Sequence, residues 1–257
     1  MIKEEIKFQD SCVFEGMTSI RAIIKSIDSN ISNRKIEKIL YDEENLKKIS
    51  KEVSYFKAVS EKYGFILEAT NDSALQKITL GNSHGGIVAI CSERKIPKLD
   101  EKSLIEENGF YAMIQGIEDP YNFGYALRSL YATGCSGIIL PERNWMTAAG
   151  VVCRSSAGAS ELFPIFSSDP LFAADYFKAK NYTVVCADTR TDKILGKCEL
   201  KKPLLLIVGG EKRGISKNLL DKCDVKVRID YSREFSASLS AASAATIFAY
   251  EIMRQNS

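Results

Sequence analysis

The sequence predicts an α/β protein of two domains, the second of which contains a mostly parallel β-sheet. In the second half of the chain, short apolar runs typical of strands alternate with helix-length segments. Such alternation favours a parallel sheet covered by helices on both faces. The expected strands of this domain span residues 111–117, 137–140, 182–187, 204–208 and 225–229.

The first part of the chain alternates in the same way on a smaller scale, which predicts a small α/β unit. Its expected strands are residues 36–41, 65–69 and 87–91, and its expected helices are residues 18–27, residues 45–63 and a short segment from Asn71. The charged helix 45–63 carries several lysines interspersed with glutamates. It therefore fits a phosphate-tracking surface and an ordinary solvated face about equally well.

A charged segment at residues 93–108, ERKIPKLDEKSLIEEN, separates the two parts, and Pro97 interrupts any regular element in it. We therefore expect a first domain at residues 1–93, a linker at 94–108 and a second domain at 109–257.

The composition indicates a globular protein with no strong electrostatic field. Of the 257 residues, 45% are hydrophobic and 26% charged, and 35 basic against 33 acidic side chains leave a net charge of +2. Seven cysteines without a Cys-x-x-Cys pair and a single histidine argue against structural zinc and for free thiols in a reducing cytoplasm. No leader-like start and no long apolar run occurs. We expect a cytoplasmic protein without a metal or a membrane segment.

A helix with a possible anion-binding start is predicted in EDPYNFGYALRSLYATG, directly after the first strand of the second domain. Asp119 and Pro120 interrupt the strand, and Asn122 is expected as the N-cap. Gly124 lies one turn before Arg128 and leaves space for its guanidinium to reach the helix start. The expected buried stripe consists of Phe123, Leu127, Leu130, Tyr131 and Gly134. The pattern fits an anion clamp or, equally, a capped helix with a surface arginine.

Small and hydroxyl residues follow in RSSAGASELFPI, residues 154–165. Ser155, Ser156 and Gly158 are suited to a phosphate or a ribose hydroxyl, with Arg154 supplying charge. A tight connection from a helix to a strand is the more common use of such a stretch.

The stretch LLLIVGGEKRGIS, residues 204–216, puts glycines and an acid at the end of an apolar strand. The stretch lacks the Lys-Ser/Thr that ends a P-loop, and its glycines are out of register with G-x-G-x-x-G. Both observations argue against ATP and NAD as ligands. Gly209, Glu211 and Gly214 stand instead where open α/β sheets bind ligands. Glu211 then holds a ribose hydroxyl or a cation, or the glycines only form a turn. The uncharged run 238–250 follows, and its small residues allow another backbone to approach closely.

Taken in order, DPYNFGYALR, SSAGA, VGGEKRGIS and SLSAASAA resemble the motifs of the SpoU (TrmH-like) RNA methyltransferases of the SPOUT superfamily. The resemblance covers residues 109–253. Residues 12–92 look like the small ribosomal-protein-like substrate-binding domain that often precedes this catalytic domain, with His84-Gly85-Gly86 at the position of a related His-x-Gly.

The resemblance implies a SPOUT fold, in which the C-terminal segment of a parallel sheet forms a deep trefoil knot. It further implies S-adenosylmethionine as cofactor, ribosomal or transfer RNA as substrate, and a homodimer with active sites at its interface.

The family's site residues transfer by position. Asn122 and Arg128 match the first motif, Glu211 matches the second, and Ser240 stands where the family usually has asparagine. The positions that match the cofactor-binding backbone are Gly209, Gly210, Gly214, Ile229 and Leu239. The chain also reads Ile229-Asp230-Tyr231 where the family usually has Ile-Pro-Met.

The implied reaction is transfer of a methyl group to a ribose 2′-hydroxyl of RNA. An arginine is a poor general base, so Arg128 is expected to hold the target phosphate and stabilise the developing alkoxide. Two alternatives remain open, an RNA-binding relative without turnover because of Ser240 and an RNA base methyltransferase.

Overall fold

The protein forms two compact units in a computed structural model, which describes residues 12–79, 84–141, 148–210 and 214–257. One unit comprises the described residues of Met1–Lys95 and of Asn144–Leu162, and the other those of Ile96–Arg143 and of Phe163–Ser257. The described part of this segment, residues 148–162, thus interrupts the second unit in the sequence but packs with the first.

The first unit is built on a four-stranded sheet with the order β1-β4-β2-β3. Its strands are β1 (Val13–Glu15), β2 (Ile36–Asp42), β3 (Ile66–Thr70) and β4 (Ile87–Cys91). Its helices are α2 (Gly16–Asp28), α3 (Leu46–Tyr63), α4 (Asp72–Ile78), α6 (Ala149–Ser155) and the short 3-10 helices η1 (Glu43–Asn45) and η3 (Ala159–Glu161). β2 and β3 are parallel, whereas β4 pairs antiparallel with β1 and β2.

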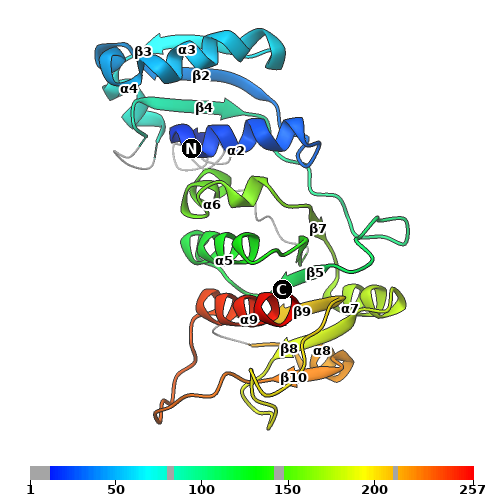
Figure 1. The fold of residues 1–257 in the computed structure, drawn as a ribbon. Coiled ribbons are helices and arrows are strands. Elements are labelled where there is room, and N and C mark those ends of the chain that lie inside the picture. The colour runs from blue at the N-terminus through cyan, green and yellow to red at the C-terminus, as the bar shows by residue number, and fades with distance from the viewer. Residues whose placement is uncertain (1–11, 80–83, 142–147, 211–213) are drawn as a thin grey trace, which may run out of the picture. The chain divides into compact units, whose positions relative to one another are not determined.

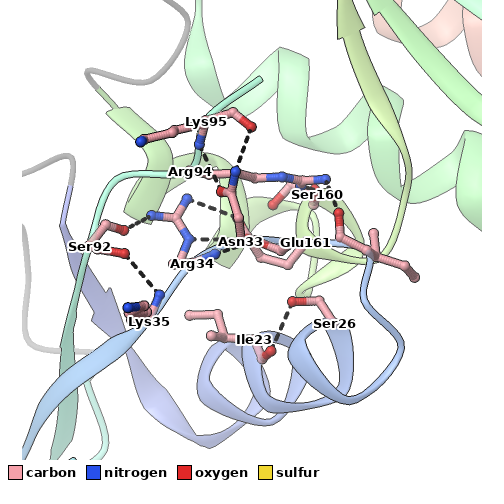
Figure 2. A network of polar contacts seen from close by, with 12 residues as sticks. Ile23, Ser26, Asn33, Arg34, Lys35, Ser92, Arg94, Lys95, Ser160 and Glu161 are labelled. Carbon is pink, nitrogen blue, oxygen red and sulfur yellow. Dashed lines mark hydrogen bonds and ion pairs between the residues drawn. The ribbon is translucent and has the colours of Figure 1, made fainter. Parts of the chain in front are cut away.

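The inserted segment belongs to the core of this unit. Ala149 and Cys153 of α6 pack in one apolar cluster with residues of α2, β2 and β4. Gly158 approaches α2 so closely that a Cβ there would lie 2.5 Å from the Cβ of Ala22. A buried ion pair between Arg34 and Glu161 and a hydrogen bond from the Arg94 side chain to the Ser160 carbonyl reinforce the contact (Figure 2). The segment is therefore fixed to the first unit by shape and by charge.

The second unit contains a six-stranded, all-parallel sheet with the order β10-β8-β9-β5-β6-β7. Its strands are β5 (Phe110–Ile114), β6 (Gly137–Leu140), β7 (Ile165–Ser167), β8 (Thr183–Ala187), β9 (Leu204–Val208) and β10 (Val225–Val227). Its helices are α5 (Pro120–Ala132), α7 (Pro170–Ala179), α8 (Lys217–Lys222) and α9 (Ala241–Asn256).

Helices cover both faces of this sheet (Figure 1). On one face, α7 and α8 bury their apolar side chains against alternate residues of β5, β8 and β9. On the other, α9 packs against β9 and lies beside α5. Every residue of β5 and β9 is buried, as expected for central strands of a parallel sheet covered on both faces.

The predicted α/β fold with a parallel sheet is confirmed, whereas four local predictions were wrong, one of them the strand expected at 225–229, which ends at Val227. The strand expected at 111–117 ends at Ile114. The N-cap of α5 is Asp119 rather than Asn122, because the Asp119 side chain accepts a hydrogen bond from the Asn122 backbone N–H at 2.8 Å and Pro120 fills the first helical position. Tyr131 and Gly134, expected in the buried stripe, are exposed.

No helix within the described ranges is long and apolar enough to cross a membrane. Those same ranges contain no group of three or more His, Cys, Asp or Glu side chains arranged to hold a metal ion.

Candidate functional site

A cavity of about 320 Å³ lies at the carboxyl ends of three neighbouring strands of the second unit. It is lined by Ala187 at the end of β8, Val208 at the end of β9, Val227 at the end of β10, and the loops that follow these strands. Its volume is at the lower end of the range of small-molecule pockets. This edge is where open parallel sheets bind their ligands, because the connecting loops diverge there.

All five residues predicted to bind cofactor line this cavity: Gly209, Gly210, Gly214, Ile229 and Leu239. They come from the loop after β9 and from the segment between β10 and α9. The sheet order brings these two regions together, since β8 lies between β9 and β10.

The two glycines after β9 allow backbone segments to approach one another. A Cβ at Gly209 would lie 2.6 Å from the carbonyl carbon of Gly214, and one at Gly210 would lie 2.8 Å from the Cα of Gly116. Gly214 N–H donates to the Gly210 carbonyl at 2.9 Å and closes the loop. Any larger residue at 209 or 210 would displace the cavity wall. Glu211, predicted to act in catalysis, falls within this loop and lies outside the described residues.

The start of α9 forms another wall of the cavity, with Leu239 and Ala241 among its lining residues. Ser240 between them is the N-cap of α9, and its Oγ accepts the Ser243 N–H at 3.1 Å. The Leu239 N–H donates to the Tyr231 hydroxyl at 3.2 Å and ties the loop to the helix start. Ser240 itself is not a lining residue, so its observed role is to begin the helix.

The two predicted catalytic residues of α5 do not line the cavity. Arg128 is exposed and makes no ion pair within the part of the chain that the structure describes. Asn122 lies in the first turn of the helix. The loop leading to α5 does reach the cavity wall, because Gly116 contacts Gly210 and the Gln115 N–H donates to the Val208 carbonyl at 2.9 Å.

The loop after β8 supplies lining residues that the sequence reasoning missed: Asp188, Thr189 and Arg190. Asp188 is largely buried and pairs with Arg190 at 3.1 Å. Their position at a strand end was the available signal, but the place of β8 between β9 and β10 could not be read from chain order. The neighbouring Cys186 is unsuited to nucleophilic attack, since a hydrogen bond with Cys223 and burial raise the pKa of its thiol.

The small-residue stretch after α6 is a connection rather than a phosphate site. The hydroxyls of Ser155 and Ser156 are buried and donate to backbone carbonyls one turn earlier. Arg154 pairs with Glu15 at 2.7 Å within the first unit. His84 is also buried, and its Nδ1 accepts the Gly86 N–H at 3.1 Å, which fits a structural role.

Comparison with known proteins identifies the class to which this fold and cavity belong. The sequence profile of the SpoU rRNA methylase family matches residues 109–250. The 23S rRNA (guanosine-2′-O-)-methyltransferase RlmB of Shewanella oneidensis is 30% identical over 197 residues, which cover 75% of this chain and 80% of RlmB. The putative TrmH family tRNA/rRNA methyltransferase YacO of Bacillus subtilis is 26% identical over 234 residues, covering 89% and 92% of the two chains.

A solved structure is similar in fold over most of the chain. The SpoU methyltransferase AviRb of Streptomyces viridochromogenes, in complex with the cofactor AdoMet, superposes with a TM-score of 0.75 at 23% identity, covering 95% of this chain and 89% of AviRb.

The fold and the site therefore define an RNA methyltransferase. The chain belongs to the SpoU rRNA methylase family, as the ordered motifs predicted.

Proposed function

We propose that this protein transfers the methyl group of S-adenosylmethionine to a ribose 2′-hydroxyl of ribosomal or transfer RNA. The observation that carries the proposal is the cavity at the carboxyl ends of β8, β9 and β10, which all five cofactor positions of the family line. The named activities of RlmB and of the family support ribose methylation.

The residues of the cavity fit S-adenosylmethionine. Gly209 and Gly210 leave a cradle that a Cβ would fill, so a ligand can contact bare backbone. Leu220 and Phe248 offer apolar surface to an adenine ring, and the Asp188 carboxylate can accept hydrogen bonds from ribose hydroxyls. When bound, the cofactor supplies an electrophilic methyl group attached to a sulfonium.

The chain's own contribution is to align the hydroxyl and stabilise its charge. Arg128 holds the phosphate of the target nucleotide and stabilises the developing alkoxide, a role that suits a guanidinium that is exposed and forms no ion pair with the residues that the structure describes. Asn122 and Glu211 hold the substrate and the loop in place, and Ser240 replaces the asparagine of the family. The hydroxyl proton passes to phosphate, to solvent or to another acceptor.

A trefoil knot of the C-terminal segment is part of the proposal. The connection between β8 and β9 contacts the chain after β10, since the Leu195 N–H donates to the Arg228 carbonyl at 2.8 Å. The same connection contacts the end of α9, since the Leu200 N–H donates to Gln255 Oε1 at 2.8 Å. Contacts of this kind are expected where the C-terminal segment passes through that connection. Such a passage is a rare exception to unthreaded topology.

A homodimer with α5 and α9 at its interface is the proposed assembly. Large hydrophobic side chains on these adjacent helices are 38–57% exposed: Tyr121, Tyr125, Tyr131, Ile247 and Tyr250. Tyr121, Tyr125 and Arg128 recur at helical spacing on one face of α5, so this interface would bring Arg128 of one subunit to a partner. Sedimentation of Tyr125→Glu should show a shift toward monomer, and an unchanged dimer would contradict this interface.

Residues 1–93 are proposed to bind RNA, with residues 94–108 as a linker and 109–257 as the catalytic domain. Exposed lysines on α3 support this role: Lys47, Lys48, Lys51 and Lys57. These cations would contact phosphate without reading sequence.

The activity is tested by mapping 2′-O-methylation in ribosomal and transfer RNA from cells with and without the gene. In vitro, Arg128→Ala should lower kcat on the mapped RNA by about 100-fold or more. Lys180→Ala, which removes an exposed cation of the same unit, serves as the control and should retain full activity. Unchanged methyl transfer by Arg128→Ala would refute the role of Arg128.

The same assay separates the two alternatives. Nuclease digestion followed by mass spectrometry distinguishes a ribose product from a methylated base. Calorimetry that detects no cofactor binding, or binding without RNA methylation, would identify an RNA-binding relative.

A further inference from the structure

A second cavity, of about 560 Å³, adjoins the cofactor cavity in the segment between β10 and α9. It is lined by Thr189 and by residues 228–238. The two cavities share lining residues, namely Thr189, Arg228, Ile229, Tyr231 and Ser238. Whatever binds in the second cavity therefore lies next to the methyl donor.

An aromatic pair lines this cavity, with Tyr231 half-buried and Phe235 exposed. The rings of Tyr231 and Phe235 meet edge to face, with centroids 6.1 Å apart and an interplanar angle of 64°. The Tyr231 hydroxyl accepts the Leu239 N–H, which fixes its ring against the start of α9. Phe235 is 59% exposed. Because Phe235 is exposed and packs against Tyr231, whose hydroxyl is hydrogen-bonded, its ring can offer a face to a ligand.

The polar residues around the pair suit a nucleotide. Asp230 neutralises Arg228 in an ion pair of 2.6 Å, whereas Arg233 is exposed and has no ion-pair partner in the described residues. Hydroxyl side chains complete the lining: Thr189, Ser232, Ser236 and Ser238. Aromatic rings stack on bases, an arginine pairs with phosphate, and hydroxyls bond to ribose or base edges.

The geometry points to Tyr231 and Phe235, with Arg233, as a stacking platform for an unpaired RNA base that flanks the methylated nucleotide. The inference rests on the proposed function, because it assumes that RNA enters the adjoining cofactor site. It assigns recognition to Tyr231, which replaces the methionine usual in the family, and to Phe235.

A single-stranded RNA fits this surface better than a second copy of the chain. The core of a protein interface is depleted in charged residues, whereas this cavity is lined by four of them: Arg228, Asp230, Arg233 and Glu234. The apolar surface proposed for the dimer lies on α5 and α9 instead. Stacking also requires an unpaired base, since bases within a duplex already stack on one another.

The test compares Phe235→Ala with Phe235→Trp and with the control Phe172→Ala, which truncates a 40% exposed phenylalanine on α7. Phe235 lines the second cavity but not the cofactor cavity, so its variants leave the cofactor cavity intact. The probes are a mixed-sequence RNA of about 12 nucleotides, as a single strand and as a duplex, together with S-adenosylmethionine.

Phe235→Ala should weaken binding of the single strand by about 5- to 150-fold, with duplex and cofactor affinity unchanged. Phe235→Trp should restore binding, and RNA should quench its emission beyond any change seen in the wild type, whose only tryptophan is Trp145. Equal affinity of Phe235→Ala and Phe172→Ala for the single strand would overturn the platform. A shift of Phe235→Ala toward monomer in sedimentation would overturn it as well, because the ring would then be a subunit contact.

Failure of the proposed function has a different signature. In that case the wild type itself methylates no RNA, whatever the ratio of the single-strand RNA affinities of the variants. The stacking platform is tested only by comparing the affinities of Phe235→Ala and Phe172→Ala for the single-stranded RNA.

Discussion

Arg34 and Glu161 are 127 positions apart in the sequence and form a buried ion pair in the first unit, with Arg34 Nε 3.1 Å from Glu161 Oε2 (Figure 2). The guanidinium also lies over the Phe14 ring at 4.5 Å and donates to the Ser92 carbonyl at 2.7 Å. Arg94 is buried nearby, where burial lowers the pKa of its guanidinium, and it donates to the Ser160 carbonyl. This network fixes the described part of the inserted segment, residues 148–162, to the unit.

Breaking this pair should be costly. Glu161→Gln leaves the Arg34 charge buried without its counter-ion, and we expect a loss of about 3–5 kcal/mol in the free energy of unfolding. The exposed pair of Lys38 and Glu68 provides the control, because Glu68→Gln should cost only about 0.2–1 kcal/mol. Urea unfolding measures both. Equal losses for the two variants would show that the buried pair does not hold the segment.

Gly210→Ala should close the cofactor cavity. The added methyl group would meet the backbone of Gly116, which cannot move without displacing the loop before α5. Overpacking of this kind costs about 1–3 kcal/mol, so calorimetry should show binding of S-adenosylmethionine weakened by about tenfold or more. Gly134→Ala is the control, since its methyl group meets nothing within 4 Å and only the positive φ of +80° is strained. Undiminished binding by Gly210→Ala would mean that the cofactor binds elsewhere.

Ser240→Asn separates the structural from the chemical role of this position. Asparagine caps helices as well as serine does, so the melting temperature should not change. The amide of asparagine reaches further than the serine hydroxyl and adds hydrogen-bond donors. We therefore expect kcat for methyl transfer to rise on the order of tenfold, which corresponds to the free energy of about one hydrogen bond. Ser240→Ala should instead lose about 1 kcal/mol of stability through the missing cap. A lower kcat for Ser240→Asn would show that the serine is itself the adapted residue.

The C-terminal helix should lose stability in acid. Hydrogen bonds from Arg254 and Gln255 lower the pKa of Glu251 to about 2 from its ordinary value of 4.5. A carboxyl with a lowered pKa in the folded state stabilises it above the unfolded pKa, and this contribution disappears as the pH falls from about 4.5 toward 2. Glu251→Gln should therefore be less stable than the wild type at neutral pH, with a difference that shrinks toward pH 2. A constant difference across an acid titration would contradict the assignment.

Much of the site was predictable because its residues are adjacent in sequence. Gly209, Gly210 and Gly214 follow one apolar strand, and the resemblance to the SpoU motifs added Ile229 and Leu239 to the same predicted site. The contribution of Asp188 was not predictable. It depends on β8 lying between β9 and β10, which is a property of strand order and not of the chain's own order.

The α/β class and most of the strands were predictable from hydrophobic periodicity and strand ends, which are local, and the family and the candidate cofactor positions were predicted from the resemblance of the ordered motifs. The tertiary structure alone placed the segment that contains α6 with the first unit and an aromatic pair beside the cofactor cavity. Those outcomes depend on which distant residues meet, as Arg34 and Glu161 do. Local sequence patterns do not predict which of these long-range contacts form.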